Sequence, residues 1–183
     1  WRMTQSPTQS PLSNVEIDGH AAWPAVLSSV REYWMNKRGA RLMPGRDDVR
    51  PTEIKKLLPH ILLADAIDGG TDFRYRLVGT QITPFFPANP SGQLMSEALA
   101  PFGDATTQAT ITSYRGVLAR RVPMRLTGAG SIYGQEPKHF DAYLAPLSSD
   151  GETANMILGA FVFVWDSQHP FRAPPSDNAI RPA

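Results

Sequence analysis

Histidine and aspartate are the residue types in this chain best suited to acid–base or metal chemistry. The four histidines, His20, His60, His139 and His169, are scattered, and none has the spacing to another that a metal-binding pair needs. His139 and Asp141 stand two positions apart in a predicted strand, so they share one face and could act as a general-base pair. A surface or edge ion pair is the commoner role for such residues. We therefore expect no metal site and no catalytic residue.

Arginine offers a second kind of chemistry, because guanidinium groups bind carboxylates and phosphates. Arg74 and Arg76 could form an anion clamp, but they alternate with the apolar residues of their strand and should face solvent or ion-pair partners. Arg46, Asp47 and Asp48 are expected to form a salt-bridged turn. A solvated helix end is expected for the remaining cluster, which comprises Arg115, Arg120, Arg121 and Arg125.

The composition narrows the classes of function. The chain has 183 residues, 42% hydrophobic and 19% charged, with a net charge of +1, so bulk charge recruits neither nucleic acid nor a membrane surface. It contains no cysteine, which excludes disulfides, thiolate catalysis and cysteine-ligated metals. No apolar run is long enough to span a bilayer. We expect a cytoplasmic protein without nucleic-acid or membrane partners.

Several predicted helices would position a functional site in this chain. The spacing predicts an amphipathic helix from about Trp23 to Gly39, with an apolar stripe formed by Trp23, Val26, Leu27, Val30, Tyr33 and Trp34. A short second helix is predicted after Pro51, ending before Pro59. Four prolines limit residues 81–102 to short helical pieces. Asp104 can cap a longer helix that reaches about Arg120.

Five strands are predicted. Ile61 to Ile67 is apolar throughout, and Phe73 to Leu77 alternates after an Asp-Gly-Gly turn, which predicts a hairpin. Three more candidates follow at Pro123–Ile132, Lys138–Leu147 and Asn155–Trp165. Strands grouped around one helical block indicate an α+β fold with a five-stranded antiparallel sheet. The apolar first and last strands are expected at its centre.

The folded domain should span residues 20–166. Residues 1–19 are rich in Ser, Pro, Thr and Gln, which predicts a flexible N-terminal segment. Residues 167–183 contain four prolines, which predicts an extended Pro-rich C-terminal tail.

The element order and a set of local residues resemble a bacterial PAS-like family of short, often single-domain proteins. The resemblance spans about Trp23 to Val164 and is most specific between Trp34 and Thr80. The matching residues are Trp34, Arg38, Gly39, Pro44, Arg46, Asp47, Pro51, Ile54, Leu57 to Pro59, Leu63, Asp65, Phe73 to Thr80, Pro146 to Ser148, Asp150 and Gly151. It implies strand order 2-1-5-4-3, helices on one face and an N-terminal amphipathic helix. Residues 85–92 depart from the usual Gly-rich turn beside the PAS cavity.

Two cofactors used by PAS domains do not suit this chain. Flavin modules that respond to blue light form an adduct on a cysteine, which is absent. Haem-binding modules need an axial histidine on the long helix, and residues 104–120 contain none. We expect neither flavin-adduct nor haem chemistry, and we assign no cofactor.

The resemblance implies a ligand cavity between the inner sheet face and the helical block. An apolar wall with a few hydroxyls suits a small, partly apolar ligand. Its expected wall comprises Tyr75, Leu77, Phe85, Tyr114, Leu118, Met124, Leu126, Tyr143 and Leu158. A filled core without any ligand is the equal alternative.

The stripe on the first helix covers the outer sheet face and could also pair with the same helix of a second chain. Trp23 and Trp34 would expose much apolar surface in a monomer, so we expect a homodimer. The expected function is a stand-alone, non-enzymatic sensory or regulatory module that binds a small molecule or a partner protein and signals to a downstream protein by a change of shape. The alternatives are a small hydrolase or isomerase built around His139 and Asp141, and a structural adaptor.

Overall fold

The computed structural model describes residues 14–16, 23–128 and 139–165. Its centre is an antiparallel sheet of six strands in the order β1-β4-β5-β6-β2-β3. The strands are β1 (Asn14–Glu16), β2 (Ile61–Ile67), β3 (Asp72–Val78), β4 (Met124–Gly128), β5 (His139–Ser148) and β6 (Ala154–Val164).

All five strands predicted from the sequence are present, and they lie in the expected order 2-1-5-4-3, here β3-β2-β6-β5-β4. The apolar strands β2 and β6 are neighbours at the centre. The sequence did not predict β1, which pairs with β4 at the edge of the sheet, with Val15 opposite Leu126. Residues 14–16 therefore form a sheet edge, although we expected them to belong to a flexible segment. Three residues among polar neighbours give no periodic signal, and pairing with β4 orders them.

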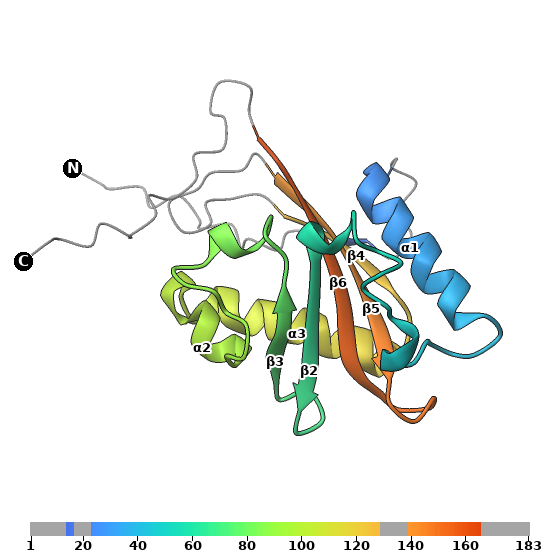
Figure 1. Ribbon diagram of the computed structural model, residues 1–183. Coiled ribbons are helices and arrows are strands. Elements are labelled where there is room, and N and C mark those ends of the chain that lie inside the picture. Colours follow the sequence, from blue (N-terminus) through green and yellow to red (C-terminus); the bar gives the residue numbers. More distant parts are fainter. Residues whose placement is uncertain (1–13, 17–22, 129–138, 166–183) are drawn as a thin grey trace, which may run out of the picture.

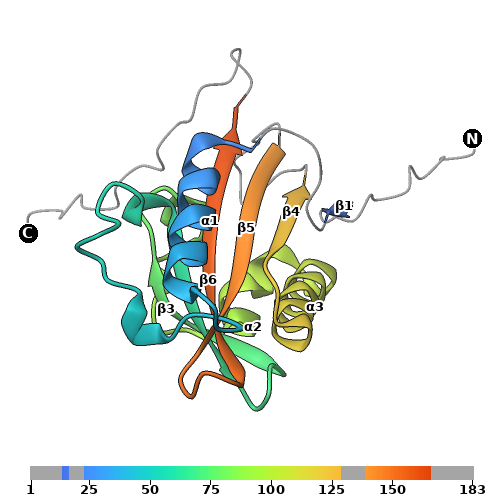
Figure 2. The ribbon, with the colours of Figure 1, turned by 90° about the vertical axis from the view of Figure 1, so that its right-hand side faces the viewer.

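Helices cover both faces of the sheet. α1 (Ala25–Arg38) lies on one face, called here the outer face, and α2 (Met95–Leu99) and α3 (Asp104–Arg120) lie on the opposite, inner face (Figures 1 and 2). Both long helices were predicted. Between β3 and α3, the short pieces η3 (Thr83–Phe85), α2 and η4 (Ala100–Phe102) confirm that the proline-rich stretch allows only brief helices.

The prediction of a helix after Pro51 is wrong. The chain forms successive turns there, in which Ile54 N donates to Pro51 O and Leu57 N donates to Ile54 O, before a 3₁₀ turn, η2 (Leu58–His60). Ile54 is the one buried side chain between Pro51 and Lys56. A segment that is short and buries one residue gains too little to offset the cost of nucleating a helix.

Two apolar cores result, one on each face of the sheet. The inner core joins the five strands from β2 to β6 to the helices α2 and α3. It includes Phe73, Tyr75, Tyr114 and Met95. The outer core joins the sheet to α1 and to the loop that follows it, with Leu27, Val30, Trp34, Met43, Val49 and Ile54 among its members. Each long helix thus buries its apolar face against the same sheet.

Trp34 of α1 and Trp23, which precedes this helix, are turned onto the sheet of their own chain. Trp34 is 1% exposed, and its Nε1 donates to the Pro146 carbonyl of β5 at 2.9 Å. Trp23 meets Tyr143 edge to face at a ring-centroid distance of 5.7 Å. Most of the apolar surface on which we based the expected homodimer is therefore buried, because the helix folds against its own sheet, while Trp23 stays partly exposed. The homodimer itself stays a prediction.

Candidate functional site

A β-bulge in the first hairpin separates two residues that strand alternation would place together. Leu63 pairs with Leu77, but the next residue of β2, Ala64, pairs with Tyr75, so that Arg76 is an extra residue. Tyr75 consequently belongs to the inner core and Leu77 packs against the outer core. The expectation that both line one cavity is wrong, because the extra residue reverses the alternation.

The remaining predicted wall residues also divide between the faces. Tyr114, Leu118, Met124 and Leu126 join Tyr75 in the inner core. Tyr143 and Leu158 lie in the outer core, as Leu77 does. Phe85 lies apart from both cores, beside a separate small pocket. Five of the nine residues thus share the inner face, and their role in ligand binding stays a prediction.

Tyr75 and Tyr114 are the polar members of that inner group. Each is 2% exposed, and neither hydroxyl has a hydrogen-bond partner among the residues that the structure describes. Burial raises the pKa of both phenols, and the neighbouring Tyr114 and Asp72 raise the pKa of Tyr75 further. Both groups therefore stay neutral, each able to donate and to accept a hydrogen bond.

Aromatic rings surround these two phenols. Tyr114 meets Phe73 edge to face at 5.2 Å between ring centroids, and Tyr75 meets Phe86 at 5.8 Å. Phe86 in turn contacts Phe102 at 6.1 Å. The site combines an apolar enclosure with two hydroxyls, one from the sheet and one from α3.

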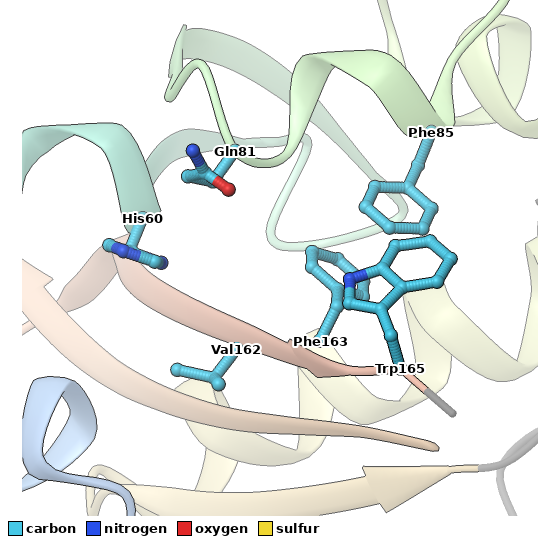
Figure 3. A pocket seen from close by; sticks show the side chains of 6 residues that line it. All are labelled: His60, Gln81, Phe85, Val162, Phe163 and Trp165. Carbon is cyan, nitrogen blue, oxygen red and sulfur yellow. The ribbon is translucent and has the colours of Figure 1, made fainter. Parts of the chain in front are cut away.

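A small pocket lies where β6 runs past the start of β2. The last pair between the two strands is Ile61 with Ala160, so that Val162 and Phe163 extend beyond β2. The lining residues are His60, Gln81, Phe85, Val162, Phe163 and Trp165 (Figure 3). Its volume is about 60 Å³. Of these residues the sequence singled out only Phe85 as a site candidate, because the pocket joins three segments that no short motif connects.

Asp141 has a different partner from the one expected. The Arg125 guanidinium binds it with two hydrogen bonds, Nε to Oδ1 at 2.9 Å and Nη2 to Oδ2 at 2.5 Å. Both side chains are only 6% exposed, and Trp23 lies over the guanidinium at 5.0 Å from the ring centroid. His139 is exposed at the start of β5. Both Asp141 oxygens already hold Arg125, so a general-base pair with His139 is not formed.

Arg125 also corrects an expectation, because it is a buried strand residue and not part of a solvated helix end. Its position in β4 opposite Tyr143 turns it onto the outer core. Arg115 and Arg120 do lie on the exposed side of α3, and Arg121 follows the helix with a left-handed backbone. The prediction was wrong for Arg125 because this residue lies in β4, whereas the other three arginines lie in or directly after α3.

The other charged groups have structural roles. Arg76 pairs with Asp65, and Arg74 Nη1 donates to the Gly92 carbonyl at 2.9 Å, which confirms that neither faces the inner core. Asp48 accepts from Gly45 N at 2.7 Å and from Arg41 at 2.8 Å, and both bonds lower its pKa. The turn does contain a salt bridge, but it joins Asp48 to Arg41. Arg46, the basic partner that we expected, instead donates from Nη1 to the Val49 carbonyl at 3.2 Å.

The residues that carry the family resemblance hold the scaffold. Trp34 bonds Pro146 O, and Ser148 N donates to Pro44 O at 3.1 Å. Ser148 Oγ and Asp150 bond each other at 2.7 Å within the β5–β6 turn. The resemblance therefore reports how the chain folds more directly than what it binds.

The described helices do not include one with the length and apolar character that a membrane span requires. Among the described residues, no group of three or more His, Asp or Glu side chains is placed to hold a metal ion.

Comparison with known families identifies a match over most of the chain. The model of the PAS domain matches residues 24–162, which include every described helix and strand except β1 and the last two residues of β6. Neither the curated proteins nor the solved structures include a match to this chain. PAS domains are sensory and regulatory modules and are typically not enzymes. By this match over most of its length, the chain belongs to the PAS domain family.

Proposed function

We propose that this PAS domain is a sensory or regulatory module that binds a small, partly apolar ligand between β3 and α3. The observation that carries the proposal is the pair of tyrosine side chains Tyr75 and Tyr114, each 2% exposed, whose hydroxyls make no hydrogen bond to another described residue. A ligand with a polar atom between the two phenols would give both hydroxyls a hydrogen-bond partner.

The surroundings limit the chemistry of the ligand. Phe73, Phe86 and Phe102 offer apolar contacts, and no charged group is needed to hold a neutral molecule beside two neutral phenols. The ligand would be small and apolar over most of its surface, with a hydroxyl, carbonyl or amide that meets Tyr75 and Tyr114. A filled core in which ordered water satisfies both hydroxyls is the competing state.

A ligand in this position would couple the sheet to the helical block. Tyr75 belongs to β3 and Tyr114 to α3, so binding would favour one placement of α3 against the sheet. The start of α2 is tied to β3 separately, because Ser96 Oγ donates to Asp72 Oδ2 at 2.5 Å. The signal would then pass from this layer to a partner protein, which a second copy of the chain could be.

The alternative of a small enzyme around His139 and Asp141 has no support from a specific observation. Arg125 holds both oxygens of Asp141, and the Asp141 side chain is only 6% exposed, which leaves little of this carboxylate open to a substrate. We therefore propose a binding function and no catalytic residue.

Native mass spectrometry of the purified protein tests the proposal, with Tyr75→Phe, Tyr114→Phe and the double variant compared with the wild type. We expect a small molecule to co-purify with the wild type and to be reduced in each single variant and absent from the double variant. Tyr33→Phe is the matched control, because Tyr33 is a partly exposed tyrosine of α1 that bonds Glu53. The same spectra report the number of chains in the assembly.

The opposite outcome is equally clear. If no molecule co-purifies and the double variant is as stable as the wild type or more so, the hydroxyls hold only water and the core is filled. Replacing a polar group that has no partner by an apolar one of the same shape is neutral or stabilising.

A further inference from the structure

The pocket at the end of β6 has one polar side and one aromatic side. In Figure 3, His60 and Gln81 stand on one side, and the rings of Phe85, Phe163 and Trp165 stand on the other. Val162 lies between the two groups along β6. This division suits a planar molecule that stacks through its face and hydrogen-bonds through its edge.

On the polar side of the pocket, His60 and Gln81 have side-chain atoms that can hydrogen-bond to a ligand. His60 Nδ1 lies 3.0 Å from the Phe161 carbonyl oxygen. A carbonyl oxygen can only accept, so Nδ1 carries the hydrogen and Nε2 is the ring atom that can accept from a ligand. Gln81 adds an amide with both a donor and an acceptor. Its side chain makes no hydrogen bond to another described residue, while its backbone N donates to Pro59 O at 2.8 Å and fixes its position.

The aromatic side is held in place by stacking. Phe85 and Phe163 stack with 3.7 Å between ring centroids, and Phe85 and Trp165 are 5.7 Å apart at 20° between planes. Phe163 also lies nearly parallel to Phe161. These rings form a wall whose orientation is set by the fold before any ligand arrives, which lowers the cost of binding.

The size of the pocket sets the class of ligand. At about 60 Å³ it is far below the roughly 300–1,000 Å³ of pockets that enclose drug-sized molecules. A pocket of this size can take part of a single ring, with the polar edge of the ring toward Gln81 and His60. The lining residues carry no carboxylate, Lys or Arg, so nothing on this wall calls for a strongly charged ligand.

We propose that this pocket is a second ligand site, which binds a neutral, single-ring aromatic compound bearing a group that both donates and accepts hydrogen bonds, such as a carboxamide. The ring lies against Phe85 and Phe163. The donor of the ligand meets His60 Nε2 or the Gln81 oxygen, and its acceptor meets the Gln81 amide nitrogen. This site is distinct from the Tyr75–Tyr114 site, because it lies at the rim of the sheet and not within the inner core.

One short segment joins the two sites. Phe85 lines the pocket, and the next residue, Phe86, contacts Tyr75. Occupancy of the pocket fixes η3 and thereby the ring that covers Tyr75, so the two ligands would influence each other's affinity.

Benzamide is the probe, with cyclohexanecarboxamide as the comparison that has the same amide without an aromatic face. In ¹H–¹⁵N correlation spectra of the whole chain, we expect benzamide to cause saturable shifts at His60, Gln81 and Phe163, and cyclohexanecarboxamide to bind several-fold more weakly. Gln81→Leu removes the edge contacts and should weaken benzamide binding by about two- to tenfold, the equivalent of one hydrogen bond. Gln108→Leu is the matched control, because Gln108 is an exposed glutamine on α3.

Four results would overturn the proposal, the first three of which concern benzamide binding at the pocket. These three are the absence of saturable shifts with benzamide, equal binding of the two amides, and unchanged binding in Gln81→Leu. Shifts confined to Tyr75 and Tyr114 would also overturn it, because they would report the inner-core site. Conversely, Tyr75→Phe and Tyr114→Phe should leave benzamide binding at Gln81 in place, so failure of the inner-core proposal does not decide this one.

Discussion

Gly79 shows how closely two segments of this fold approach each other. A Cβ atom at this position would lie less than 3.0 Å from the carbonyl oxygens of both Pro59 and Leu58. Gly79 N also donates to Ile61 O at 2.8 Å, which holds the end of β3 against the turn before β2. The contact atoms are backbone, so a side chain here cannot be accommodated by a change of rotamer.

Gly79→Ala should therefore lower the free energy of unfolding by about 3 kcal/mol, at the upper end of the cost of overpacking. Urea denaturation followed by circular dichroism measures it. Gly116→Ala is the control, because a Cβ at Gly116 in α3 meets nothing closer than 3.6 Å and alanine favours helices by about 1 kcal/mol over glycine. Equal stability of wild type and Gly79→Ala would contradict this close approach of the two segments.

At the scale of elements, the β5–β6 turn is held by one carboxylate. Asp150 Oδ1 accepts from Thr153 N at 2.7 Å, from Ser148 Oγ at 2.7 Å and from Glu152 N at 2.9 Å. These bonds, with that of Thr153 N the strongest, hold the pKa of Asp150 well below its usual range. The ionised carboxylate is thus the form that the folded turn selects.

This lowered pKa predicts a pH dependence of stability. A carboxylate whose pKa is lower in the folded state contributes stability above its unfolded pKa of about 3.9, and the contribution is lost as the pH falls below that value. Asp150→Asn should therefore lower stability at pH 7 and flatten the decline of stability between about pH 4 and pH 2. Thermal unfolding over this range measures both effects, and Asp47→Asn, at an exposed aspartate, is the control. A decline as steep in Asp150→Asn as in the wild type would contradict this role.

At the scale of the whole molecule, one sheet supports two separate apolar layers. The inner layer carries the proposed ligand site, and the outer layer fixes α1. α1 is attached at both ends, by Trp34 to β5 and by Trp23 over the Arg125–Asp141 pair of β4 and β5. The buried ion pair is therefore part of the attachment of α1.

Breaking this pair should be costlier than replacing it. Asp141→Leu alone leaves Arg125 buried without its carboxylate and should lower the free energy of unfolding by about 3–5 kcal/mol. Arg125→Met combined with Asp141→Leu should recover most of the loss, because apolar side chains of similar size need no partner. Denaturant unfolding of the two single variants and the double variant measures the coupling. Additive losses would show that the pair is not energetically linked.

Much of the fold could be predicted from the sequence, because its signals are local. The apolar run Ile61 to Ile67, the alternating strand after it and the cap at Asp104 each report their own conformation within a few residues. Those signals also indicate which elements are central and the α+β class, whereas the strand order was implied by the resemblance to PAS domains. The absence of cysteine in the sequence excluded thiolate chemistry with equal certainty.

Only the tertiary structure decided which side chains meet. The bulge at Arg76 moves Leu77 to the outer face, Arg125 takes the carboxylate of Asp141, and Trp23 and Trp34 turn onto their own sheet. The pocket of His60, Gln81 and Phe163 unites segments far apart in the chain. Each of these depends on the register between distant strands, and a shift of one residue reverses the face of every side chain that follows. The sequence by itself determined the scaffold, and long-range register determined where the candidate sites lie on it.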